Sequence, residues 1–442
     1  MSAPTDGLMD LSEAGAAVLD AADPLSALRD RFEMPRREDG TPLIYLCGHS
    51  LGPMPRDART LVEAELETWS RLGVDGWFRE PAPWLTAVER LADATGRIVG
   101  ASPHEVVTMN GLTVNLHLLF ATFYRPTPER YAVLMERDAF PSDRYAVEGQ
   151  VRHHGLDPAA TIIRVGARRG ENLLRTEDIE AVIRADGRRI ALVWLPGVQF
   201  LTGQRLDIER ITAAARERGA LAGWDLAHAA GNVPLRLHDW DVDLAVWCTY
   251  KYLNGGPGAV GQAFVHERHA RNAELPRLGG WWGNAPGTRM EMREPFEPRP
   301  EAAGWLVSTP PILALAPLRA SLELFEEAGM AALRERSMRL TTYLEAQLDA
   351  VGIRPIITPR DPEERGAQLS IRVRDAAAVQ RRLAAAGAIV DDRPPDLIRV
   401  APAPLYSTFA EVRRFAQLFA EVLVGGAASA PRPSPDEPGQ PN

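Results

Sequence analysis

Three residues with the chemistry of a catalytic site follow two strand-like runs in the middle of the chain. Asp225 ends the run 221–225 and His228 lies just beyond it, while Lys251 follows the run 244–249. Small-molecule sites in open parallel sheets lie beyond the carboxyl ends of the strands, where neighbouring strands open onto one crevice. We therefore expect a carboxylate, an imidazole and a primary amine to converge there.

Pyridoxal phosphate is the cofactor that requires such a combination. A lysine amine binds it as a Schiff base and later moves the α proton of the substrate, so Lys251 is the predicted anchor. A carboxylate, here Asp225, pairs with the pyridinium nitrogen so that the ring can serve as an electron sink. A stacked aromatic ring would fix the plane of the pyridine, and amides with hydroxyls would hold the phosphate. The runs 110–115, with Thr113, and 140–143 supply these groups.

Each of these residues also has an ordinary structural explanation. A lysine at a strand end is usually a solvated surface residue, and an aspartate there is often only a helix cap. Taken singly, His228 is more typical of a satisfied core histidine and Phe140 of core packing. Their joint occurrence at the ends of predicted strands favours the cofactor interpretation, because independent coincidences multiply.

Two further motifs have weaker support. The run 256–261 matches the dinucleotide pattern G-x-G-x-x-G, but a strand-like run, 262–266, follows it where the pattern requires a helix. We interpret it as a turn between strands. The run 266–269, His-Glu-Arg-His, lacks the spacing of a zinc-binding H-E-x-x-H motif, and a charged exposed turn explains it. No metal site is predicted.

The elements that position these residues alternate along the chain. Strand-like runs at 131–135, 190–195, 221–225 and 244–249 are separated by amphipathic helical stretches such as 207–218. This alternation predicts an α/β fold with a mainly parallel sheet covered by helices on both faces.

The chain divides into four predicted segments. Residues 1–50 form an N-terminal arm with one amphipathic helix, and 51–320 form the large α/β domain that binds the cofactor. Residues 321–424 alternate helices with strand-like runs, which predicts a smaller C-terminal α+β domain. Residues 425–442 are rich in Gly, Ala, Ser and Pro and are predicted to be disordered.

The composition is that of an ordinary soluble globular protein. Of the 442 residues, 45% are hydrophobic and 25% are charged, and no apolar run is long enough to span a membrane. The net charge of -9 and the lack of a basic stripe argue against nucleic acid as a partner. The two cysteines, Cys47 and Cys248, form no disulfide framework, and no signal peptide is recognisable. We expect a cytoplasmic protein.

Ten short runs carry a resemblance to a known family, and they lie at 48–53, 112–117, 140–143, 197–204, 225–229, 238–240, 247–254, 280–283, 310–313 and 398–402. Together they resemble the kynureninases, which are pyridoxal-phosphate enzymes of fold type I. The resemblance spans most of the chain, from about Tyr45 to Tyr406. It implies a seven-stranded, mainly parallel sheet and a smaller C-terminal domain.

The resemblance implies a role for each matching residue. Lys251 would bear the cofactor, Asp225 would pair with the ring nitrogen, and Tyr250 would contact the phosphate and take part in proton transfer. Arg399 would hold the α-carboxylate of the substrate with its planar fork. The further cofactor contacts that it implies are Leu112, Thr113, Phe140, Pro141, Ser142, Asp143, His228, Trp281 and Thr309. The substrate contacts that it implies are Ser50, Trp77, Trp281, Ser308 and Arg399.

The resemblance also implies a homodimer, because Trp281 and the pair 308–309 resemble residues that a neighbouring subunit contributes. Three positions depart from the family pattern: many relatives have Asn at His49, Ser or Thr at Pro196, and some have Asn at Thr309. Trp77 resembles a substrate-ring contact where some relatives carry histidine. A tryptophan stacks but lacks the imidazole hydrogen bond, so we expect a preference for kynurenine over 3-hydroxykynurenine.

The implied reaction is the hydrolysis of L-kynurenine to anthranilate and L-alanine by cleavage of the Cβ–Cγ bond. The alternative is another enzyme of the same fold type, such as an aminotransferase or a cysteine-desulfurase-like lyase. A desulfurase needs a mobile nucleophilic cysteine in a late loop, and none occurs after Cys248. A third hypothesis is a cofactor-binding regulator without activity. The full set of lysine, aspartate, aromatic ring and arginine argues against it.

Overall fold

A seven-stranded sheet forms the centre of the structure, a computed structural model that describes residues 9–428. Its strand order is β4-β10-β9-β8-β7-β5-β6, and β10 runs antiparallel to both neighbours while the other neighbouring pairs are parallel. The predicted mainly parallel sheet is therefore confirmed. The strands are β4 (Val106–Thr108), β5 (Ala132–Glu136), β6 (Ile162–Val165), β7 (Ile190–Pro196), β8 (Leu221–Asp225), β9 (Leu244–Cys248) and β10 (Gly261–Val265).

Helices pack against this sheet along apolar faces. α8 (Ile208–Glu217) lies on β8 and buries Ile208, Ile211 and Ala215, which are spaced at helical intervals. The Asp207 side chain accepts a hydrogen bond from the Arg210 amide and so caps its N-terminus. The other helices of the large domain are α2 (Asp57–Leu72), which packs on α10 (Ile312–Ala328), and α3 (Glu89–Val99), α4 (Leu112–Phe123), α5 (Pro141–His153), α6 (Pro158–Thr161), α7 (Thr176–Asp186) and α9 (Glu267–Ala270).

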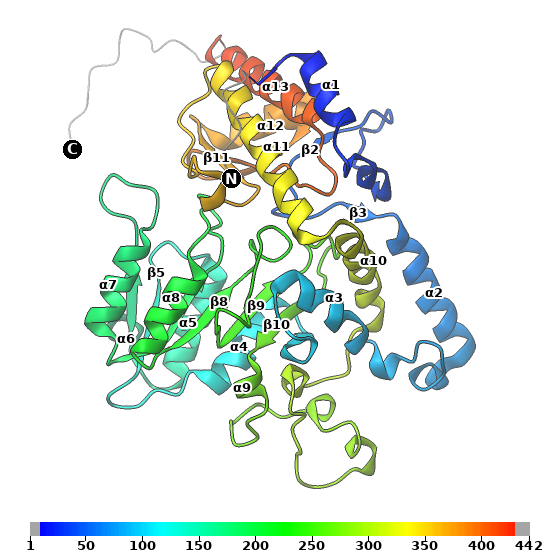
Figure 1. The fold of residues 1–442 in the computed structure, drawn as a ribbon, viewed down its shortest axis with the longest axis vertical. Coiled ribbons are helices and arrows are strands. Elements are labelled where there is room, and N and C mark those ends of the chain that lie inside the picture. Colours follow the sequence, from blue (N-terminus) through cyan, green and yellow to red (C-terminus); the bar gives the residue numbers. More distant parts are fainter. Residues whose placement is uncertain (1–8, 429–442) are drawn as a thin grey trace, which may run out of the picture.

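A second, smaller core lies beyond one end of the sheet and includes part of the N-terminal arm, such as Ala16 and Leu46 (Figure 1). α1 (Glu13–Ala21) packs on α13 (Phe409–Ala428), and β2 (Ile44–Tyr45) pairs in parallel with β12 (Ala388–Ile389). Beside them, β14 (Leu397–Val400) lies between two antiparallel neighbours, β11 (Leu369–Arg372) and β13 (Asp391–Arg393). Together with α11 (Met330–Ala350) and α12 (Ala376–Ala386), they form an α+β unit.

Two of the predicted segment boundaries fall inside helices. The boundary at 320/321 falls inside α10, and Phe325 and Leu333 still belong to the large core, whereas Leu340 belongs to the small one. The change therefore occurs within α11, because one continuous helix serves both cores. α13 extends to Ala428, so 425–428 are helical instead of disordered, and the rest of the predicted tail, 429–442, lies outside the described residues.

The stretch 271–311 between α9 and α10, called the loop segment below, contains only short helical turns (Figure 1, light green at the lower edge). These turns are η5 (Trp281–Gly283), η6 (Arg289–Glu291) and η7 (Ala302–Trp305). The remaining short elements are η1 (Ser26–Arg31), β1 (Phe32–Glu33), β3 (Met54–Pro55), η2 (Gly73–Trp77), η3 (Trp84–Thr86), η4 (Pro103–Glu105) and η8 (Pro362–Glu364). Within residues 9–428, no helix is both long and apolar enough to cross a membrane.

Candidate active site

One cavity lies at the carboxyl ends of β4, β5, β7, β8 and β9, and residues at or just after each of these ends line it. The predicted site residues that the structure brings together there are Leu112, Thr113, Phe140, Ser142, Asp143, Asp225, His228, Tyr250 and Lys251. The remaining lining residues are Glu136, Ala139, Trp194, Leu195, Pro196, Val198, Phe200 and Ala227. The expected convergence of acid, imidazole and amine is thus present in the fold.

Lys251 supplies the amine of this cavity, and it is the sole lysine among the 442 residues. Its Nζ lies 5.9 Å from the centre of the Phe140 ring and 6.0 Å from that of Tyr250. Phe140 in turn meets Phe200 edge-on, with 5.2 Å between the ring centres. The amine is therefore surrounded by aromatic surface, which suits a flat heteroaromatic ring bound next to it.

Asp143, which is buried, and Asp225, which is half-buried, form an acid pair facing Lys251. Desolvation raises the pKa of Asp143 well above its usual range, and the neighbouring Asp225 charge raises it further. Burial also raises the pKa of Asp225, but the Lys251 charge and the Ala227 amide oppose that shift. Asp143, which accepts a hydrogen bond from Trp194 Nε1 at 2.9 Å, is thus the neutral partner. Asp225 is the ionised one, and an ionised carboxylate is what a pyridinium nitrogen requires.

Two helices begin at the cavity wall and direct their free amides toward it. α4 starts at Leu112 after Gly111, and α5 starts at Pro141 after Phe140, with neither N-terminus capped by a side chain. Thr113 and Ser142, each in the first turn of its helix, approach each other with 2.7 Å between their hydroxyl oxygens. Uncapped amides with hydroxyls are suited to hold a phosphate, so this wall fits the phosphate of the cofactor.

The remaining polar groups of the cavity differ in protonation. Burial and the positive charges of Lys251 and Arg399 lower the pKa of His228 well below its usual value, so its ring is neutral. Burial raises the pKa of the Tyr250 phenol, so this residue keeps its proton at neutral pH. The cavity therefore contains a protonated phenol as a proton donor close to Lys251.

The turn that contains Ser50 packs directly behind Lys251. The Gly52 amide donates to the Tyr250 carbonyl at 2.8 Å, and a side chain at Gly52 would lie only 2.5 Å from the Lys251 carbonyl oxygen. Only glycine allows this approach. Ser50 donates its amide to the Cys47 carbonyl and does not line the cavity.

Arg399 borders the cavity from the small core without lining it. It is 1% exposed, and its Nη1 donates to the carbonyl of Phe200, a cavity residue, at 2.7 Å. Its Nη2 donates to Asp391 Oδ2, also at 2.7 Å, across the antiparallel pair of β14 and β13. Pro141 is likewise adjacent to the cavity, between Phe140 and Ser142, but does not line it.

Four predicted site residues lie away from this cavity within the single chain. Trp77 packs against Trp84 and Trp282, with ring centres 5.5 and 5.4 Å apart. Trp281 is 48% exposed on the loop segment, and its Nε1 donates to the Arg289 carbonyl. The other two, Ser308 and Thr309, are exposed at the end of that segment.

The sequence interpretation did not anticipate several lining residues. Glu136 is buried, accepts a hydrogen bond from Gln199 and has its pKa raised to about 7 by desolvation. Its place at the end of a predicted strand was the signal that could have found it. Trp194 lies within such a strand, where the sequence pattern indicates only a buried core residue. The absence of a second lysine was a further signal for Lys251 that composition alone contains.

The two weaker motifs have structural explanations. Gly256 and Gly258 have positive φ angles of 93° and 70°, and the strand β10 begins at Gly261, which gives the predicted turn between strands. His266 lies near Glu105 and Asp241, whereas His269 contacts Asp243 at 2.7 Å, so these histidines point to different carboxylates.

The chain is similar to known proteins along most of its length. Residues 333–419 match the family model of the kynureninase C-terminal domain. A protein named kynureninase from Koribacter versatilis is 51% identical over 413 residues, which is 93% of this chain and 97% of that protein. A kynureninase from Myxococcus xanthus is 52% identical over 414 residues, covering 93% and 97%, and one from Xanthomonas oryzae pv. oryzae is 54% identical over 411, covering 92% and 97%.

Among solved structures, a cysteine desulfurase from Thermococcus onnurineus superposes with a TM-score of 0.72 at 17% identity, covering 87% of this chain and 95% of that one. A cysteine desulfurase from Escherichia coli gives 0.71 at 16%, covering 90% and 98%. The fold is therefore that of the type-I pyridoxal-phosphate enzymes. Within this class, the identities above show that the chain belongs to the kynureninase family.

Proposed function

We propose that the protein hydrolyses L-kynurenine to anthranilate and L-alanine with pyridoxal phosphate as cofactor. The observation that carries this proposal is the convergence of Lys251 and Asp225 in one cavity of a chain more than 50% identical to proteins named kynureninase. The direct test incubates the purified protein with pyridoxal phosphate and L-kynurenine. Anthranilate and alanine should form in equal amounts, and their absence would refute the proposal.

The cavity residues fit the cofactor group by group. Lys251 would hold it, Asp225 would keep its ring nitrogen protonated, and Phe140 would stack on the ring. The first turns of α4 and α5, with the Thr113 and Ser142 hydroxyls, would hold the phosphate. When bound, pyridoxal phosphate supplies an electron sink for the charge that develops on the substrate.

Two residues of this chain move protons at the substrate. The Lys251 amine, freed when substrate takes its place, removes the α proton. Tyr250, whose raised pKa keeps its phenol protonated, returns a proton to the β carbon after the Cβ–Cγ bond is broken. Hydrolysis itself requires one water, which adds to the γ carbonyl.

A cysteine desulfurase is the second candidate, because the solved structures of similar fold include such enzymes. Their chemistry needs an exposed, reactive thiol. Burial raises the pKa of Cys47 to about 12 and also raises that of Cys248, which lies inside β9. Neither thiol is suited to be a nucleophile, and no other cysteine occurs in the 442 residues.

The functional form is a homodimer in which the loop segment completes the site of the partner. This explains why Trp281, Ser308 and Thr309 resemble site residues yet lie away from the cavity of their own chain. The exposed large apolar side chains of the loop segment are Leu278, Trp281, Met290, Met292 and Phe296. Such a concentration is typical of a surface that another protein covers. We further propose that the protein acts in the cytoplasm, in tryptophan catabolism by the kynurenine pathway, which also leads toward NAD biosynthesis.

Trp77 favours kynurenine over 3-hydroxykynurenine as substrate. It lies in an aromatic group with Trp282, which in turn contacts Trp281 with 5.7 Å between ring centres. A tryptophan offers no acceptor to a ring hydroxyl, so kcat/KM should favour kynurenine by about tenfold. Trp77→His should narrow that ratio. A wild-type preference for the hydroxylated substrate, or equal values, would contradict the assignment.

A further inference from the structure

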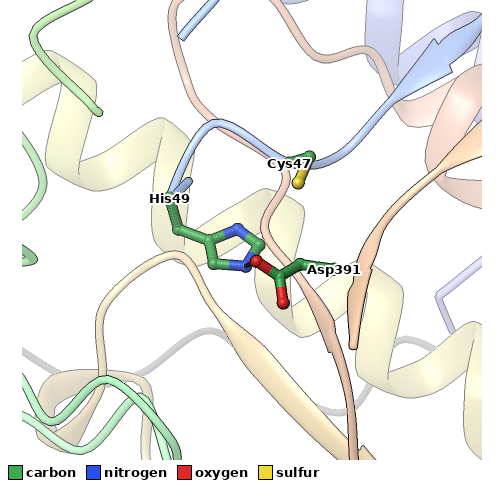
Figure 2. Close-up of side chains that lie close together, drawn as sticks. All are labelled: Cys47, His49 and Asp391. Carbon is green, nitrogen blue, oxygen red and sulfur yellow. Dashed lines mark ion pairs between the residues drawn. The ribbon is translucent and has the colours of Figure 1, made fainter. Parts of the chain in front are cut away.

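A buried polar cluster lies beside the cavity, where the turn after β2 meets β13 and β14. His49, on that turn, faces Asp391 of β13 (Figure 2). The His49 side chain is completely buried, yet neither of its ring nitrogens has a hydrogen-bond partner within residues 9–428. Buried polar groups are nearly always hydrogen-bonded, and leaving one unpaired destabilises a fold. The His49 ring is therefore suited to pair with a group from outside the chain.

Arg399 and His49 approach the same carboxylate oxygen. Asp391 Oδ2 accepts a hydrogen bond from Arg399 Nη2 at 2.7 Å and lies 4.0 Å from His49 Nε2, which is too long for a hydrogen bond. The Arg399 Nε–H is also buried and has no acceptor in the described part of the chain. Within the described residues, the Arg399 Nε–H and the His49 ring N–H are therefore both available as hydrogen-bond donors beside Asp391.

The charges of the cluster favour an anion. Two guanidiniums, Arg399 and Arg393, share the single carboxylate of Asp391. His49 adds no charge, because burial and the nearby Arg399, Arg393 and Lys251 charges lower its pKa well below the usual value. The cluster therefore has a surplus positive charge in a buried place, and an entering carboxylate would neutralise it.

A metal ion suits the same place poorly, although donor atoms of Cys47, His49 and Asp391 lie within 4.8 Å of one another (Figure 2). The Cys47 thiol has its pKa raised to about 12 and stays protonated, and Asp391 is already paired with two arginines. A cation would be repelled by both guanidiniums. The charges of the cluster therefore favour a carboxylate over a cation.

We propose, on the basis of the function proposed above, that His49 donates its N–H to the α-carboxylate of the substrate, next to Arg399. The cluster borders the cavity at two points. The His49 ring centre lies 6.3 Å from that of His228, which lines the cavity, and Arg399 bonds to the carbonyl of Phe200, which also lines it. An amino acid bound in the cavity next to Lys251 can extend its carboxylate toward these two donors, while Arg393 retains Asp391. His49 thereby selects amino acids over simple amines.

The test compares two ligands that differ only in the carboxylate, L-alanine and ethylamine. The cofactor-loaded protein is titrated with each, and the dissociation constant is taken from the change in the visible absorbance of the cofactor. His49→Phe keeps an aromatic ring but removes the N–H donor. It should weaken L-alanine binding about tenfold, as expected for a hydrogen bond to a charged group, and leave ethylamine within about twofold. His49→Asn, whose amide can donate, should lie within about threefold of the wild type for L-alanine.

Two controls keep the result interpretable. Tyr406→Phe removes a buried hydroxyl that lies against Gly48 of the same turn and has no hydrogen-bond partner within residues 9–428, and it should leave the alanine-to-ethylamine ratio unchanged. His49→Leu replaces His49→Phe if the latter does not fold. Equal weakening of both ligands, or unchanged alanine binding in the apolar variant that folds, would overturn the role of His49. Kynurenine turnover by the wild type is measured separately, so a failure of the proposed function is distinguishable.

Discussion

The sheet-end cavity and the loop segment both contain residues that resemble a family site, but only the cavity assembles within one chain. In the cavity, Asp225 and Lys251 follow adjacent parallel strands, so the sheet itself brings them together. In the loop segment, Trp281 is 48% exposed and Met292 is 77% exposed. Hydrogen-bonded strands thus position the cofactor-binding residues within one chain, whereas the residues of the loop segment that resemble substrate contacts remain exposed, which is why we propose that a partner covers them.

The largest expected effect comes from removing the amine of the cavity. Lys251→Ala should lower turnover of kynurenine by at least about 10⁴-fold, because both the covalent anchor and the base are lost. It should also abolish the visible absorbance of the bound cofactor. Since no other lysine exists in the chain, borohydride reduction of the wild type should label one lysine-containing peptide, which mass spectrometry would identify. Turnover that survives in the variant would refute the anchor role.

The two acids of the cavity should respond differently to the same substitution. Asp225→Asn removes the charge that holds the ring proton, and kcat should fall by about 10² to 10³. Asp143→Asn is nearly isosteric with the neutral acid and still accepts from Trp194 Nε1, so its kcat should fall about tenfold or less. Steady-state kinetics with kynurenine would decide. Equal losses in the two variants would contradict the assigned difference in protonation, and a larger loss in Asp143→Asn would mean that the ionised acid has been assigned to the wrong residue.

Complementation between two defective variants tests whether the loop segment serves the partner. Trp281→Ala alone should lower kcat/KM about tenfold or more, because an aromatic contact at an interface is removed. Mixed with Lys251→Ala after dissociation and reassociation, it should form heterodimers with one complete site and regain up to about a quarter of wild-type activity. If Trp281 acted in its own chain, mixing would restore nothing above the activity of Trp281→Ala itself.

The sequence predicted the cavity better than its surroundings. Strand ends at Asp225 and before Lys251 follow from local apolar runs, so the position of both residues could be inferred without long-range information. The pairing of Arg399 with Asp391 depends on the register of two antiparallel strands, which no local pattern fixes. The same holds for the N-terminal arm, where Ile44 pairs with Ala388. Contacts between segments so distant in the sequence leave no signal in either segment alone.

The smallest expected effect is on stability, and it comes from the buried Glu136 at the end of β5. Desolvation raises its pKa to about 7, so the folded state binds a proton more tightly than the unfolded state does. Its contribution to stability is therefore lost as pH rises from about 4.5 through 7, by about 3 kcal/mol in total. Glu136→Gln should raise Tm by roughly 3 °C relative to the wild type at pH 8 and by much less at pH 5.

The matched control for Glu136 lies in the other region. Glu294 is an exposed acid of the loop segment, and Glu294→Gln should change Tm by less than about 0.5 °C at either pH. Calorimetry at pH 5 and pH 8 on both variants separates the two cases. If the two variants shifted Tm equally, desolvation at the sheet end would not be the cause. A pH-dependent gain confined to Glu136→Gln would show that the carboxyl end of the sheet is kept dry enough to hold carboxyl groups neutral, which is the same condition that leaves Asp143 protonated beside an ionised Asp225.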